Sequence, residues 1–169
     1  RELHEKAGAL YEEGGFDAPA KRSRSKALFA NFCLEENSEK RKGVLEGCLS
    51  LATEAAQLFE NRGDKRHLAE TRGDILRYSR EIYHLSTESE LRCSEFERML
   101  EVGRTAVVES EAVGDDQLLL EALHLTLWVL AVEAETVLEP AEFKKLADET
   151  TRLGGKIVEV SKRVGTSFA

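Results

Sequence analysis

The chain has 169 residues, of which 33% are charged, and a formal net charge of −8. This length is typical of one domain, and the acidic balance disfavours nucleic acid as a partner. The chain contains two prolines and no alternating runs of β-branched residues, so we expect an all-α fold.

The first residues predict two short amphipathic helices joined by a tight turn. One helix is expected over about residues 2–13, and it ends at Gly14-Gly15. The second begins after Asp17, which is a good helix cap, and continues to about residue 36. Small residues are expected where the two helix backbones approach closely, at Gly8, Ala20 and Ala27. Ala18 is expected to lie nearer to solvent.

A small residue, a glycine and an aromatic residue occur on the first of these helices, and one alanine stands early and another late on the second. The residues are Ala7, Gly8, Tyr11, Ala20 and Ala27. With these spacings, residues 1–34 resemble a tetratricopeptide repeat. The resemblance implies antiparallel hairpins stacked as a right-handed superhelix (an α-solenoid), and a function in binding other proteins.

Apolar spacing and stop signals predict five further helices, which makes about seven in all. They are expected over about residues 41–62, 65–85, 88–113, 117–138 and 140–165, and Thr87 with Glu90 has the spacing of a capping box. The hairpins would then span about 1–36, 41–85 and 88–138, followed by a terminal helix over 140–165, in a single domain over 1–169. Gly154-Gly155 is expected to interrupt the last helix.

Two segments of the chain echo one another 51 residues apart. Each has an alanine and then a Gly-Asp pair eight and nine residues later, at Ala55 with Gly63-Asp64 and at Ala106 with Gly114-Asp115. The glycine supplies the left-handed backbone that ends one helix, and the aspartate can cap the next. The first copy resembles the repeats of large signalling ATPases and transcriptional regulators.

The sequence contains no pattern typical of catalysis or of metal binding. His67 and Glu70 could share a helix face, but a divalent metal needs more ligands. The cysteines, Cys33, Cys48 and Cys93, are odd in number and lack paired spacing, so we expect reduced thiols and a cytoplasmic protein. We therefore expect no enzymatic activity, no cofactor and no metal.

The sixth expected helix is apolar almost all round, and two interpretations remain open. It is either a central core helix, or part of it, including Trp128, meets a partner or a second copy of the chain. The same alternatives apply to Leu120, Leu127 and Val132. The apolar run over 118–132 is shorter than a membrane span and contains charged Glu121, so no membrane association is expected.

Charge points to a basic partner. Four glutamates are expected to crowd one end of the first helix and to form an acidic site: Glu2, Glu5, Glu12 and Glu13. Tetratricopeptide domains that hold acidic chaperone tails have a lysine and an asparagine where this chain has Glu5 and Ala9, so the resemblance argues against a carboxylate ligand. The basic cluster that contains Lys21, Arg22, Arg24 and Lys26 is expected to be a solvated face.

The sequence therefore favours a protein–protein interaction scaffold or adaptor that binds a peptide or helix of a partner in a groove. The alternative is a ligand- or peptide-sensing regulatory domain of a larger signalling or transcriptional protein. A pocket with a few converging polar groups would favour the alternative over an open groove.

Overall fold

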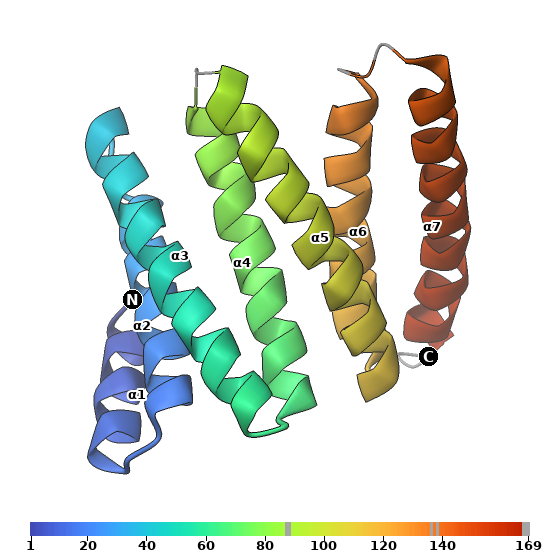
Figure 1. The fold of residues 1–169 in the computed structure, drawn as a ribbon. Coiled ribbons are helices and arrows are strands. Elements are labelled where there is room, and N and C mark those ends of the chain that lie inside the picture. Colours follow the sequence, from blue (N-terminus) through green and yellow to red (C-terminus); the bar gives the residue numbers. More distant parts are fainter. Residues whose placement is uncertain (87–88, 136, 138, 167–169) are drawn as a thin grey trace.

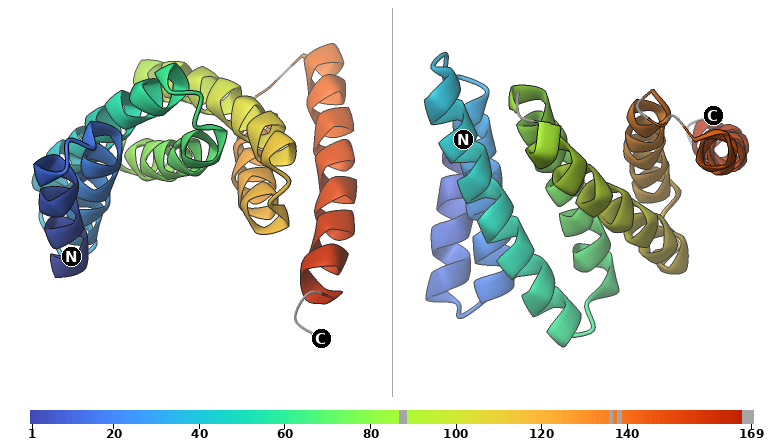
Figure 2. Two further views of the ribbon diagram at one scale, coloured as in Figure 1. Left: turned by 90° about the horizontal axis from the view of Figure 1, so that it is seen from below. Right: turned by 45° about the horizontal axis from the view of Figure 1, so that its top comes forward.

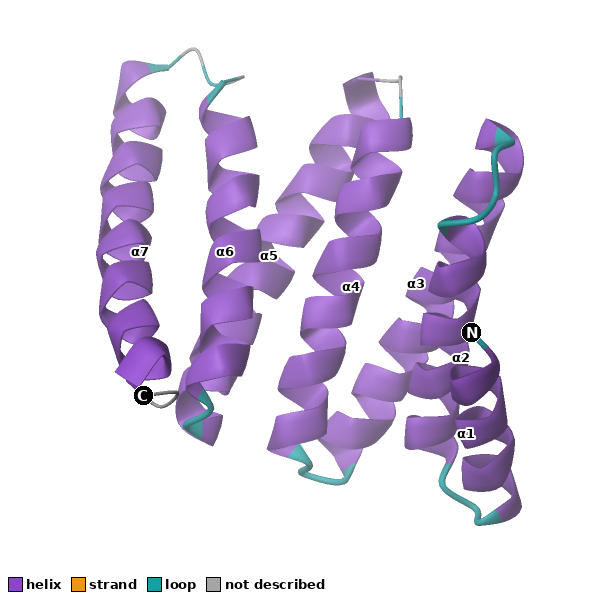
Figure 3. Ribbon diagram, turned by 180° about the vertical axis from the view of Figure 1, so that it is seen from behind, coloured by secondary structure: helices purple, strands orange, loops and turns teal. Residues whose placement is uncertain are grey.

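The computed structural model describes residues 1–86, 89–135, 137 and 139–166, and all regular structure in these ranges is helical. The helices, shown in Figure 1 and from behind in Figure 3, are α1 (Glu2–Glu13), α2 (Asp17–Phe32), α3 (Ser38–Asn61), α4 (Lys65–Leu85), α5 (Ser89–Val113), α6 (Asp116–Ala134) and α7 (Pro140–Thr166). Each helix packs on the next in chain order, and α4 also contacts α6. The all-α solenoid of stacked hairpins is thus confirmed.

Each of the three hairpins turns on a glycine in the left-handed region. The φ angles are 72° at Gly15, 69° at Gly63 and 75° at Gly114. The next residue then caps the following helix in two of the hairpins: the carboxylate of Asp64 accepts from the backbone N–H of His67 at 3.2 Å, and that of Asp115 accepts from those of Gln117 and Leu118, each at 3.1 Å. The repeated Gly-Asp therefore marks equivalent turns.

Some expected helix ends differ from the structure. Helix α2 ends at Phe32, four residues early, and α3 begins earlier than expected, because the side chain of Asn37 caps it by accepting from the backbone N–H of Lys40. Helix α6 ends at Ala134 instead of near residue 138. The expected capping box at Thr87 lies outside the described residues.

The interruption expected at Gly154-Gly155 is wrong, since α7 runs through it without a break. Leu146, Leu153 and Val160 recur at intervals of seven residues and are all buried, so continuous packing holds the helix together across the glycines. A helical glycine costs only about 1 kcal/mol relative to alanine, which such packing outweighs.

The core is continuous through α4. One cluster joins α4 to α5, α6 and α7, and a second joins α4 to α2 and α3. Ala20 and Ala27 are buried, as expected, but Ala18 is fully buried as well and its expected exposure is wrong. Ala18 packs in the second cluster with Cys48 and Ala52, a contact with α3 that the local α1–α2 pattern could not reveal.

The hairpins form an arc. Seen from below in Figure 2, α3 and α5 lie along its outer side and α4 and α6 along its inner side. By length and composition alone, α6 could also cross a membrane, a property that it shares with core helices of soluble proteins. Its residues Leu119, Leu123 and Leu130 are buried in the core, and Leu120, Leu127 and Val132 are partly buried against it. The core interpretation is confirmed for Leu119, Leu123 and Leu130, and for the three partly buried residues it stays a prediction.

Candidate functional site

The second helices of the three hairpins, α2, α4 and α6, together form a polar surface, which we call the inner face. A pocket of about 370 Å³ lies on it and is lined from all three helices. Its lining is dominated by charged side chains: Arg22, Lys26, Glu70, Asp74, Arg77, Asp115 and Glu121. These residues lie far apart in the sequence, so only the stacking of the hairpins brings them together.

Asp74 is the centre of this surface. Its side chain is only 5% exposed, and three cations surround its carboxylate. The distances are 2.9 Å from Arg22 Nε, 3.5 Å from Lys26 Nζ and 3.4 Å from the Arg77 guanidinium. A buried carboxylate needs such partners, because an unpaired buried charge is costly. Asp74 therefore connects α2 to α4.

Further ion pairs extend from this centre to α6. Arg22 also pairs with Glu70, and Arg77 pairs with Glu121 on α6. Burial by itself would lower the pKa of Arg22, but Asp74 and Glu70 hold the net pKa above its ordinary value. The burial of Glu70 opposes its ionisation, yet Arg22 keeps the pKa of this carboxyl below its ordinary value. Arg22 and Glu70 thus stabilise one another in their ionised forms.

Trp128 lies on α6, where it meets the end of α4. Its ring is 6.0 Å from that of Tyr83 in an edge-on arrangement and 5.2 Å from that of His84. The guanidinium of Arg80 stands 5.9 Å from the Trp128 ring, within the range of a cation–π contact. Trp128 as a whole residue is half-buried, and its ring packs against α4 through Tyr83 and His84.

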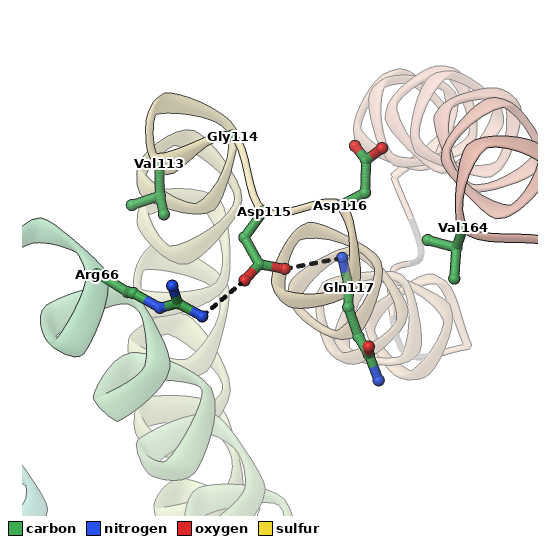
Figure 4. Close-up of a pocket in the computed structure, with 7 residues that line it drawn as sticks. All are labelled: Arg66, Val113, Gly114, Asp115, Asp116, Gln117 and Val164. Atoms are coloured by element: carbon green, nitrogen blue, oxygen red, sulfur yellow. Dashed lines mark hydrogen bonds and ion pairs between the residues drawn. The ribbon is translucent and has the colours of Figure 1, made fainter. Parts of the chain in front are cut away.

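A second pocket, of about 450 Å³, lies beside the turn between α5 and α6 (Figure 4). Asp115 points into it, caps α6 and receives an ion pair from Arg66 at 3.2 Å. Asp116 is held by Arg163 of α7 at 2.7 Å. Both carboxylates therefore already have structural partners. The two ion pairs connect this turn to α4 and to α7.

The four glutamates expected to crowd one end of α1 do not do so. Glu2 and Glu5 lie in its first turn and Glu12 and Glu13 in its last, because the helix separates them along its length, and all four are exposed. Glu5 pairs with Arg1, and Glu12 pairs with Arg24 of α2. Their expected role in binding stays a prediction.

The basic cluster is a solvated face only in part, since Arg24 is exposed but other members are not. Arg22 and Lys26 are drawn into the inner face, and Lys21 pairs with Glu54 of α3 at 2.5 Å. The partner of Arg22, Asp74, lies 52 residues away, so no local spacing could have identified the pair. The only available signal was a dense group of cations on one helix of an acidic protein.

Within the described ranges, no group of three or more His, Cys, Asp or Glu side chains could hold a metal ion. His67 instead bonds through Nδ1 to Asp64 at 2.8 Å and stacks on Phe59, with ring centroids 5.2 Å apart. Cys48 is fully buried, and burial raises the pKa of its thiol to about 12, so it behaves as a small apolar side chain.

No family model matches the chain, and no curated protein matches it. The structure is similar to that of the de novo designed helical repeat protein DHR81, with a TM-score of 0.62 and 20% sequence identity, over 98% of this chain and 77% of that chain. A further designed helical repeat protein, DHR64, aligns with a TM-score of 0.45 and 18% identity, over 96% of this chain and 78% of that one. The likeness to DHR81 shows the helical-repeat fold alone.

Proposed function

We propose that this protein is a scaffold or adaptor for protein–protein interactions, which binds an extended peptide or a helix of a partner along the inner face. The observation that carries the proposal is the pocket lined from α2, α4 and α6. A ligand lying across this surface would contact three hairpins at once, which is how stacked repeats create extended binding surfaces. The resemblance of residues 1–34 to a tetratricopeptide repeat supports the same class of function.

We propose a basic partner. Helix α6 contains no lysine or arginine, and its Glu121 side chain is 45% exposed. Trp128 lies two helical turns beyond Glu121 on the same face of α6. A lysine or arginine of the partner can pair with Glu121, and a second one can stack on the half-buried Trp128. The exposed glutamates Glu2 and Glu13 of α1 would add to the attraction at longer range.

The test uses the fluorescence of Trp128, the single tryptophan of the chain. Titration with basic, acidic and neutral peptide pools should change the emission with the basic pool alone, and less so at high salt, because salt screens exposed charges. Glu121→Lys should weaken binding at least tenfold. The matched control Glu101→Lys reverses an exposed charge on α5 and should bind as the unmodified chain does.

A preference for the acidic pool would contradict the basic partner. Equal binding by the Glu121→Lys and Glu101→Lys variants would place the partner away from the inner face. No response to any pool would contradict the scaffold function itself.

A second candidate function is a ligand- or peptide-sensing regulatory domain, and one observation favours it. Polar groups from three helices converge on Asp74, an arrangement that can change when a small polar ligand displaces one of the ion pairs. Small polar compounds that raise the unfolding temperature, with an effect lost in Arg77→Ala, would support this candidate. Both proposals involve no catalytic step, cofactor or membrane, and both place the protein in the cytoplasm.

A further inference from the structure

The helix at one end of the arc turns apolar side chains to solvent. In α1 the one buried residue is Gly8, which faces α2. Leu3 is 81% exposed and Leu10 is 68% exposed. With Ala7 between them, these residues recur at intervals of four and three, so they form an apolar stripe on the side of α1 that is turned away from α2.

The helix at the other end, α7, has an exposed outer side as well. Phe143 is 49% exposed and Val158 is 55% exposed. A side chain added at Gly154 or Gly155 would meet nothing within 4 Å, so neither glycine is needed for packing within the chain. Figure 1 shows α1 and α7 at opposite ends of the stack, so among the helices that the structure describes none covers either surface.

The two end helices carry opposite charge. Helix α1 has four glutamates against Lys6 alone, and among the described residues Glu2 and Glu13 form no ion pair. Helix α7 has six basic residues against four acidic ones, and its exposed Lys144 and Lys145 likewise form no ion pair in the described part of the chain. Two copies of α1 would repel one another, as would two copies of α7, whereas α1 and α7 attract.

We propose that copies of this chain associate head to tail, with α1 of one copy packed on α7 of the next. The contact is heterologous, so each copy keeps one free end and growth continues unless the assembly closes into a ring. A contact between two helices buries less surface than a stable dimer requires, so association is weak and depends on protein concentration. The head-to-tail assembly would present one inner face per copy. This inference goes beyond the proposed function, which concerns the binding of one partner by one chain.

The experiment measures mass by sedimentation velocity over a range of protein concentrations, with two variants that each block one end. Leu10→Glu blocks α1, and Val158→Glu blocks α7. Each variant alone should stay monomeric, because its intact end finds no intact counterpart. An equimolar mixture should form a one-to-one dimer and grow no further. The control Val108→Glu changes a side chain of α5 that is 66% exposed and should associate as the unmodified chain does.

Three results would overturn the proposal. A Val158→Glu variant that dimerises alone would show an α1–α1 contact, and a Leu10→Glu variant that does so would show an α7–α7 contact. A monomeric unmodified chain at the highest concentration would exclude self-association altogether. None of these outcomes bears on peptide binding at the inner face. The self-association proposal can therefore be wrong while the proposed function stands, and the reverse is also true.

Charge-reversal variants keep the test decisive if either glutamate substitution unfolds the chain, which circular dichroism would show. A Glu2→Lys, Glu13→Lys variant and a Lys144→Glu, Lys145→Glu variant should each associate at least tenfold more weakly than the unmodified chain. Mixed together they should recover the association, because the charges are exchanged across the contact. Failure of the mixture to recover it would contradict the α1–α7 pairing.

Discussion

At the residue scale, Asp74 is the side chain on which the inner face depends. Asp74→Ala would leave Arg22, Lys26 and Arg77 without their shared, buried carboxylate. We expect a loss of about 3 kcal/mol in the free energy of unfolding, the range seen when one partner of a buried ion pair is removed. Urea denaturation measures this loss. The control Glu121→Gln removes a partly exposed partner of Arg77 and should cost about 0.5 kcal/mol. Similar losses in both variants would mean that burial of Asp74 is not what matters.

This network also shows why the candidate site could be predicted only in part. Trp128 can be recognised in the sequence because it is the single tryptophan. The acidic character of α6 can be read from its composition, which lacks lysine and arginine. The contacts of Asp74 are not visible, since an aspartate within a charged helix usually faces solvent. Its burial follows from the way α2 stacks on α4, which depends on the whole array.

At the scale of the element, the turns are where local chemistry decides the structure. Gly63 has a φ of 69°, so Gly63→Ala should lower the free energy of unfolding by about 1 kcal/mol. The control is Gly43→Ala within α3, where an added side chain meets nothing within 4 Å and φ is not positive. That change should raise stability by roughly 0.5–1 kcal/mol, because alanine favours helix. Thermal unfolding of both variants checks the opposite signs, and the same sign in both would contradict the turn assignment.

Helix ends were predictable where such turns mark them, as at Gly63 and Gly114. They were less so between hairpins, where α2 ends at Phe32 without a glycine or proline. The prediction for the face of α2 was also wrong at Ala18, which is buried in the cluster shared with α3 and α4 instead of lying nearer to solvent. Local patterns therefore determine where a hairpin turns, and packing between hairpins determines which of its faces are buried.

At the scale of the whole molecule, the two ends of the array should contribute unequally to stability. Each helix contacts mainly its neighbours. Removing an end helix therefore lowers the free energy of unfolding by an amount that depends on the apolar surface it covers on the adjacent helices. Helix α1 buries only Gly8, whereas α7 contributes Leu146, Leu153 and Val160 to the core it shares with α5 and α6.

Two truncations test this asymmetry. A chain lacking residues 1–15 should unfold at a temperature within a few degrees of the full chain, because little apolar surface becomes exposed. A chain lacking residues 139–169 should lose several kcal/mol, since burial of one large apolar side chain is worth about 1.5–3 kcal/mol and three of them leave the core. Thermal unfolding followed by circular dichroism gives both values. Equal losses from the two truncations would contradict this asymmetry. They would mean that the surface covered by an end helix does not determine how much that helix contributes to the free energy of unfolding.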